Sequence, residues 1–465
     1  MLPGFCTGML LGSAAGGPAG DAWFAEDGAT WPIYGTATWP SATYDSGGDR
    51  TWIVWEGWNQ DSRTTEITSY GHAAGTWSDV YVAGVVPLSD DDHGVPSLCI
   101  DGDGYLHVFY GGHNTDLRIS SSRSPNDASA WRRDTLAGTY TYPKPSVVGS
   151  AIYLFLRKFI FPSSYTLVLR KTGAIVNGEP AWGAEQSIVH FGASSRFYGG
   201  VNIIDGTDIH IVATKSPGSD TERKHVYHFI YDTTTGNVSN AEGDTTIASG
   251  DLPVDLTEAD ADFRVVEQST TEGNTPAFCI DSAGDYHIVY IDGDGTDWDV
   301  KHVTFTSGSW SSPETVVSLT SESRFLALIL VALSGGAIEL YHTEDSAGSW
   351  ARGGNMIRRE RSGAGSWGSP TTILNADPYA LDEPSAVRDG HTNLRAIFPE
   401  ISNDSAAEAG DLKLRGYGAG GFVTRATQGT VPTFPALLLD MSDRGEGTDA
   451  SFSSVVLLLD HSIGA

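Results

Sequence analysis

The sequence predicts an all-β fold, a seven-bladed β-propeller with short extensions at both ends. Two phrases recur along the chain at intervals of about fifty to sixty residues, as expected of propeller blades. Gly is abundant, with 55 copies in 465 residues, which suits many short strands joined by tight turns. No segment shows sustained helical periodicity. A chain of this length would otherwise be expected to divide into two or three domains.

The first recurring phrase is a turn rich in Asp and Gly, followed by alternating apolar residues that include a His or an aromatic residue. An Asp/Gly turn leading into period-two alternation predicts a hairpin that enters a half-buried strand. Copies lie at 101–110, 205–213, 281–290 and 334–342, with a looser copy at 46–57.

The second phrase is a Gly- or Ala-rich turn, a Trp and a short β-branched strand. The Trp residues stand at 77, 131, 182, 310 and 367, with gaps of 54, 51, 128 and 57, and the long gap equals two copies of 64. An array of β-sandwiches is the competing architecture, but it does not explain this spacing. Blades are expected near 20–85, 86–140, 141–192, 193–250, 251–318, 319–376 and 377–430. The propeller would thus occupy 21–430, with extensions at 1–20 and 431–465, the latter a possible closing strand.

The net charge of −30 argues against nucleic acid or an anionic membrane as a partner. Its distribution is uneven, because His113 to Gly200 holds ten Lys or Arg against five Asp or Glu. A cationic sector on an acidic protein suits an anionic ligand. The alternative is that these residues are strand-edge charges that discourage aggregation.

The three cysteines, at positions 6, 99 and 279, are too few for a disulfide framework, and no apolar stretch is long enough for a transmembrane helix. The first residues are mildly apolar but lack a preceding Lys or Arg. We therefore expect an extracellular or virion-associated protein without a clear signal peptide. No cofactor is required by the predicted chemistry. A structural metal is conceivable, either calcium at the acidic run 90–92 or zinc held by His210, His228, His287 and Cys279.

The densest polar cluster runs from Ser89 to Asn114. His93 precedes one predicted strand and His113 follows the next, and hairpin-connected strands return their ends to one edge. Both imidazoles are therefore expected on one face, where the Asp residues at 90–92 could orient them. His107 falls within a strand and is expected to pack between blades.

Six phrases stand out: DDHG at 91–94, DGDGYLHVFYGGHN at 101–114, YTYPKP at 140–145, LFLRK at 154–158, SSRFYGG at 194–200 and VYHFIYDTTTGNV at 226–238. They resemble motifs of the ulvan-lyase-type polysaccharide lyases, a BNR-repeat-like family. The resemblance covers about residues 40–400, is strongest over 89–238, and implies a seven-bladed propeller that cleaves uronate-containing polysaccharides by β-elimination.

The resemblance implies roles for individual residues. His93 and His113 would be the active-site histidines, and Arg196 would bind the substrate carboxylate together with His113 and Asn114. Tyr227 would face the cleft, and the third-blade tyrosine would be Tyr165, with Tyr198 as second choice. Lys144 would contact substrate where the family usually has Asn. Gly94 also replaces a usual Asn, and TKSPGSD at 214–220 replaces a His-Pro phrase, so the preferred sugar is in question.

These residue types suit the elimination of a uronate. A guanidinium that makes two parallel hydrogen bonds to the carboxylate stabilises the enolate-like intermediate. A neutral His or a Tyr of lowered pKa can then remove the C5 proton, and a second such group can protonate the departing oxygen. His93 and Tyr165 are assigned to this acid/base pair, and which one is the base stays open.

The sequence is also compatible with two other functions. The first is a non-catalytic carbohydrate-binding propeller of a tail or adhesion protein, which would stack sugars on a rim containing Trp52, Trp55 and Trp58. The second is a sialidase-like glycoside hydrolase, which would require an arginine triad and a Tyr/Glu pair.

Overall fold

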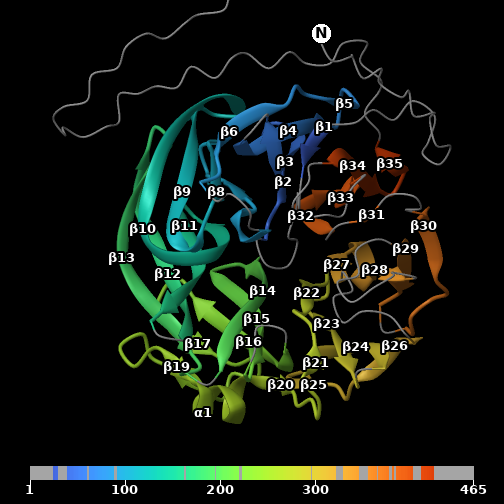
Figure 1. The fold of residues 1–465 in the computed structure, drawn as a ribbon. Coiled ribbons are helices and arrows are strands. Elements are labelled where there is room, and N and C mark those ends of the chain that lie inside the picture. Colours follow the sequence, from blue (N-terminus) through green and yellow to red (C-terminus); the bar gives the residue numbers. More distant parts are fainter. Residues whose placement is uncertain are drawn as a thin grey trace, which may run out of the picture. The chain divides into compact units, whose positions relative to one another are not determined.

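The strands of the described residues form five hydrogen-bonded sheets, of 11, 8, 6, 6 and 4 strands. We number seven successive groups of strands within them as blades, and the seven-bladed count stays a prediction. The strands follow one another around a ring in sequence order (Figure 1) and belong to one unit. The all-β class predicted from the sequence is confirmed. The computed structural model describes residues 25–29, 39–59, 62–87, 92–161, 164–193, 195–218, 222–294, 296–320, 328–344, 354–363, 365–375, 380–381, 384–401 and 410–423. Both predicted extensions, 1–20 and 431–465, lie outside these residues.

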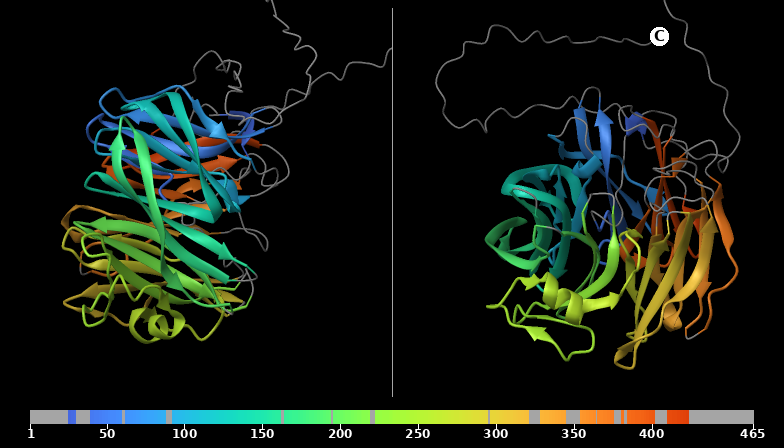
Figure 2. Two further views of the ribbon diagram at one scale, coloured as in Figure 1. Left: turned by 90° about the vertical axis from the view of Figure 1, so that its left-hand side faces the viewer. Right: turned by 60° about the horizontal axis from the view of Figure 1, so that its bottom comes forward.

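Blades two and three contain long strands and share one of them, β10. The N-terminal part of β10 pairs with β9, and its C-terminal part pairs with β11, so this strand ends blade two and begins blade three. Figure 2 shows these long strands in teal and green. The strands are β2 (Ala42–Asp45), β3 (Arg50–Asn59), β4 (Ser62–Gly71), β5 (Thr76–Trp77) and β6 (Tyr81–Val85) in blade one, β7 (Ser97–Ile100), β8 (Leu106–Tyr110), β9 (His113–Ser124) and β10 (Asp127–Val148) in blade two, and β11 (Ala151–Ile160), β12 (Ser164–Val176) and β13 (Glu179–His190) in blade three.

Blades four and five differ from the predicted boundary at 250/251. β20 pairs with β16, so blade four continues to Val266 after an excursion that contains α1 (Leu256–Glu258) and η2 (Ala259–Phe263). Within the excursion, β19 (Val254–Asp255) pairs in parallel with β13 of blade three. The strands of blades four and five are β14 (Arg196–Asp205), β15 (Asp208–Ser216), β16 (Lys224–Asp232), β17 (Val238–Ser239), β18 (Thr246–Ile247) and β20 (Arg264–Val266), then β21 (Glu272–Gly273), β22 (Ala277–Ile280), β23 (Tyr286–Gly293), β24 (Asp297–Thr306), β25 (Ser309–Trp310) and β26 (Glu314–Thr320).

The last two blades bring the chain back to its beginning. β1 pairs with β34, and Thr43 of β2 pairs with Arg388 of β32, so the first and last blades are joined by strand pairing. The strands are β27 (Leu328–Ala332), β28 (Ile338–Glu344), β29 (Asn355–Arg361) and β30 (Thr371–Asn375), with η3 (Ser334–Gly336), then β31 (Ala380–Leu381), β32 (Ser385–His391), β33 (Leu394–Ile401), β34 (Gly410–Gly418), β35 (Gly421–Val423) and β1 (Ala25–Ala29).

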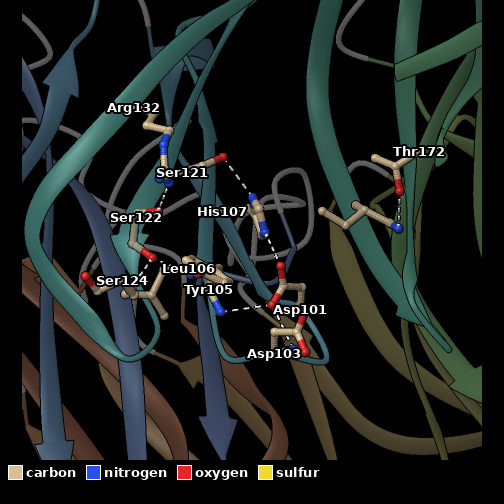
Figure 3. Close-up of polar contacts among 11 residues, drawn as sticks. Asp101, Asp103, Tyr105, Leu106, His107, Ser121, Ser122, Ser124, Arg132 and Thr172 are labelled. Atoms are coloured by element: carbon tan, nitrogen blue, oxygen red, sulfur yellow. Dashed lines mark hydrogen bonds and ion pairs between the residues drawn. The ribbon is translucent and has the colours of Figure 1, made fainter. Parts of the chain in front are cut away.

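The first recurring phrase forms hairpins, as predicted. In blade two the Asp101 carboxylate accepts hydrogen bonds from the backbone N–H groups of Asp103 and Tyr105 and lies 3.0 Å from His107 Nε2 (Figure 3). His107 Nδ1 is 2.9 Å from Ser121 Oγ. His107 is fully buried, so it is a structural residue of the blade, as its mid-strand position indicated. Asp281 and His287 repeat the arrangement in blade five.

The second phrase lies on or beside outer strands. Its Trp residues stand in β5, β10, β13 and β25 and at the bridge between Arg361 and Trp367. The hydrophobic clusters lie between neighbouring blades, for example Phe155 and Leu167 of blade three against Ile211 and Phe229 of blade four. No helix in the described residues has the length and apolar character that a bilayer crossing requires.

Candidate active site

The two predicted histidines come together. His93 lies in the short helix η1 (Asp92–Gly94) before β7, and His113 is the first residue of β9. The Gly111 N–H donates to the Gly94 carbonyl, which ties the end of β8 to the segment that carries His93. The two imidazole rings are stacked, with centroids 3.8 Å apart. Asp90 and Asp91, and the side chain of Asp92, lie outside what the structure describes.

A strained backbone places the next two side chains. Asn114 and Tyr142 both have φ of 55°, the left-handed region that non-Gly residues rarely adopt and that recurs at functional sites. The Asn114 N–H donates to Thr141 Oγ1, and the Thr141 hydroxyl donates to Asn114 Oδ1. Tyr142 thereby stacks near His93, with ring centroids 5.5 Å apart.

Arg157 of β11 is the centre of the group. Its guanidinium carbon lies 4.3 Å from the ring centroid of Tyr142, 4.4 Å from that of Tyr165 and 4.7 Å from that of Tyr198. The residue is only 4% exposed, and its Nε and Nη1 have no hydrogen-bond partner among the described residues. A buried guanidinium with unused donors is costly unless an anion completes its hydrogen bonds.

Tyr198 of β14 carries the clearest electrostatic signature. Burial by itself raises its pKa, but the positive charges of Arg157, Arg223 and Arg196 outweigh burial, so the pKa lies below that of an ordinary tyrosine. The Arg223 guanidinium carbon is 3.5 Å from the Tyr198 ring centroid. The positive charges of these arginines therefore stabilise the phenolate form of Tyr198 relative to that of an ordinary tyrosine.

Arg196, at the start of β14, lies against Tyr165, the ring that also contacts Arg157. Its guanidinium carbon is 5.4 Å from the ring centroid of Tyr165. A continuous series of ring and cation–π contacts thus leads from His113 through His93, Tyr142 and Arg157 to Tyr165 and Arg196. This series links the histidines of blade two to Arg196 at the start of blade four. Their convergence on a single sugar ring stays a prediction.

Lys144 of β10 is a buried neighbour of the group. A Cβ placed on Gly199 would lie 3.4 Å from Lys144 Cε, so the lysine stem packs against β14 next to Tyr198. Its predicted contact with substrate stays a prediction.

Tyr227 of β16 belongs to a different cluster. It is fully buried, and its hydroxyl donates to Asp260 Oδ1 at 2.6 Å, while Lys215 Nζ lies 2.9 Å from Asp260 Oδ2. Burial and this carboxylate hold the pKa of Tyr227 far above its ordinary value. The geometry therefore gives no support to its predicted role in substrate binding.

The residues proposed for zinc pair among themselves or with others. His210 Nδ1 lies 3.0 Å from His228 Nε2, and His287 Nδ1 lies 3.0 Å from His302 Nε2. The described residues contain no group of three or more His, Cys, Asp or Glu that could hold a metal ion. A structural calcium or zinc ion stays an untested prediction.

Sequence reasoning did not assign roles to Arg157, Tyr142 or Arg223. The sequence did indicate that Arg157 is buried, because this residue follows an apolar run at 151–156 that is typical of a core strand. An Arg that continues such a strand is buried beside its apolar neighbours. Tyr142 lay within a phrase quoted for the resemblance, but its outlying φ leaves no trace in the sequence.

A model of the BNR repeat-containing family matches residues 53–316, more than half of the chain. The protein belongs to this family. Among curated relatives, an ulvan lyase from Pseudoalteromonas sp. (strain PLSV) is 27% identical over 345 residues, which cover 63% of this chain and 67% of the relative. An ulvan lyase from Alteromonas sp. (strain LOR) is 24% identical over 404 residues, covering 73% and 79%.

Solved structures show a similar fold. The structure of a PL25 ulvan lyase bound to -[GlcA(1-4)Rha3S]- superimposes on this BNR-repeat protein with a TM-score of 0.71 at 21% identity, covering 87% of this chain and 97% of the other. The resemblance to the ulvan-lyase-type family that the motifs indicated is therefore confirmed.

Proposed function

We propose that this protein is a polysaccharide lyase that cleaves an acidic, uronate-containing and sulfated polysaccharide of the ulvan type by β-elimination. The observation that carries the proposal is Arg157, a buried cation with unused donors that lies against three tyrosine rings, beside the stacked pair His93 and His113. The relatives named ulvan lyases support the same reaction class.

The arginines would hold the uronate carboxylate. Removal of the C5 proton adds negative charge next to a group that is already an anion, so the barrier depends on neutralising both charges. Arg157 and Arg196 supply planar donors that match a carboxylate. Asn114 and His113 lie at the edge of the same group and are assigned as further contacts.

Tyr198 is the best-placed base. Its pKa is lowered from that of an ordinary tyrosine, which favours the deprotonated form that a general base requires. The phenolate would take the C5 proton, the C–H electrons would form the C4–C5 double bond, and the C4–O bond would break. His93 would give a proton to the departing glycosidic oxygen. Tyr165, which also faces Arg157, is the alternative to Tyr198.

The carbohydrate-binding alternative loses its predicted platform. Trp52 is 2% exposed and Trp55 is fully buried, both within hydrophobic clusters, so the expectation that they form a sugar-stacking rim is wrong. The side chain of Trp58 is not among those that the structure describes.

The sialidase-like alternative has a partial match that cannot act on a sugar. The Tyr341 hydroxyl donates to Glu339 at 2.6 Å, and Arg358 and Arg395 both bind the same carboxylate. Tyr341 and Glu339 are almost completely buried, so this cluster is an internal ion network between blades six and seven.

Ultraviolet absorbance during incubation with a panel of uronate polymers tests the proposal. Elimination forms a double bond conjugated to the carboxylate, which absorbs in the ultraviolet, whereas hydrolysis and binding do not. We expect absorbance to rise with a sulfated uronate polymer. Release of reducing ends without a rise would assign the protein to the hydrolases. Because such polymers are outside cells, the proposal places the protein there.

A further inference from the structure

The tip of the β11–β12 hairpin presents an exposed aromatic ring. Phe161 is 85% exposed and its neighbour Ile160 is 40% exposed. Exposing an apolar side chain of this size to water is unfavourable, and the free energy of the protein falls when a partner covers it. The pairing of Ile160 with Ser164 fixes the hairpin directly beneath Phe161.

This hairpin is the one that carries the candidate site. Arg157 lies four residues before Phe161 on β11, and Tyr165 lies four residues after it on β12. Four residues of extended strand span about 13 Å. A short oligosaccharide bound at Arg157 covers that distance.

Contacts below the tip hold it in place. The Phe159 and Tyr165 rings lie 5.2 Å apart across the two strands, and Thr139 Oγ1 donates to the Phe159 carbonyl at 2.6 Å. The tip is therefore tied both to the site tyrosine and to β10, and a ring at Phe161 would meet substrate with little rearrangement.

The charge near the tip indicates what it would contact. Lys158 is the only charged residue between Arg157 and Tyr165 in the sequence, and its Nζ is paired with Glu185 at 2.7 Å. Glu185 also accepts from the Tyr140 hydroxyl. The tip thus offers an apolar surface with its nearby cation already neutralised, which favours a C–H face of a sugar over a sulfate or carboxylate.

We infer that Phe161 is a substrate-binding platform that stacks on the apolar C–H face of the sugar ring adjoining the uronate in the same polymer chain. This inference rests on the proposed function. The hairpin tip would then contribute to specificity, because Phe161 binds more tightly to a polymer in which the sugar next to the uronate presents C–H or methyl groups. It holds the polymer in register and takes no part in proton transfer.

The test compares Phe161→Ala with Val176→Ala, measuring unsaturated-product formation by the full chain on polymer. Val176 is the matched control, because it is 61% exposed at the far end of the same strand β12. We expect Phe161→Ala to raise KM about tenfold with kcat within about twofold, the size expected for loss of one aromatic contact. Phe161→Trp should retain the wild-type KM, and Val176→Ala should match wild type.

Two results would overturn the inference. One is a Phe161→Ala variant with the KM of Val176→Ala. The other is a change in sedimentation on Phe161→Ala, which would mean that the ring packs against a second copy of the chain. Absence of product from wild-type protein on every polymer would instead refute the proposed lyase function, so the two failures are distinguishable.

Discussion

The imidazole rings of His93 and His113 are parallel within 5°, and their centroids are 3.8 Å apart. This stack joins the segment before β7 to the start of β9, and His93 also lies next to Tyr142, whose ring contacts Arg157. A second pair of neighbouring histidine rings, His72 and His391, lies between the first and last blades, with centroids 3.9 Å apart and planes tilted by 34°. The described residues thus contain two close histidine pairs, of which the one at the candidate site is stacked and the other is tilted.

Replacing His93 with Ala tests the proposed acid. We expect kcat for double-bond formation to fall at least about a hundredfold, because the departing oxygen loses its proton donor. Thermal unfolding should change little, since His93 is only half buried in a three-residue helix. The matched control is His391→Ala, which removes one ring of the tilted His72–His391 pair and should keep turnover. Equal losses in the two variants would rule out a catalytic role for His93.

The pH dependence of kcat/KM tests the assignment of Tyr198 as base. A base acts when deprotonated, so the rate rises with pH through the pKa of Tyr198, which the surrounding arginines lower. Arg223→Gln removes a charge 3.5 Å from the ring and should move this rise to higher pH. Arg223→Lys keeps a positive charge and should move it less. A profile unchanged in Arg223→Gln would show that another group is the base.

Arg157 should be intolerant of even a conservative change. Lys keeps the charge but cannot make two parallel hydrogen bonds, so Arg157→Lys should lower kcat/KM about a hundredfold. The control is Arg132→Lys, because Arg132 forms an ion pair with the exposed Glu179. If steady-state kinetics give the wild-type kcat/KM for both variants, Arg157 does not bind the substrate carboxylate.

The fold was predictable where local chemistry determines it. The Asp101 and Asp281 turns need an Asx carboxylate and a Gly at positive φ, and both requirements are visible in sequence. The excursion at α1 was missed, because a three-residue helix shows no periodicity.

Within the site, the meeting of His93 and His113 follows from hairpin geometry. The central position of Arg157 depends on how blades three and four pack, and that packing is a property of the whole ring. The cluster around Tyr227 depends on Asp260, which is distant in sequence and lies in the missed excursion.

Glu66 gives a test of the fold that is independent of catalysis. Burial raises the pKa of this carboxyl from 4.5 to about 7, despite hydrogen bonds from Thr64 and Trp55 that lower it. The folded state therefore binds this proton more tightly, and its stabilising contribution is full below 4.5 and lost as pH rises through about 7. Glu66→Gln should raise the unfolding free energy by on the order of 3 kcal/mol near pH 8 and have little effect near pH 4. Urea unfolding at both pH values measures it, and an equal effect at both would contradict the raised pKa.

The most direct measurement is the mass spectrum of products formed from a sulfated uronate polymer in water enriched in the heavy oxygen isotope. Elimination breaks the C4–O bond without water, so we predict products that end in an unsaturated uronate and carry no heavy oxygen from cleavage. Saturated products that carry one heavy oxygen per cut would contradict the assignment of Arg157, Tyr198 and His93 to a lyase site.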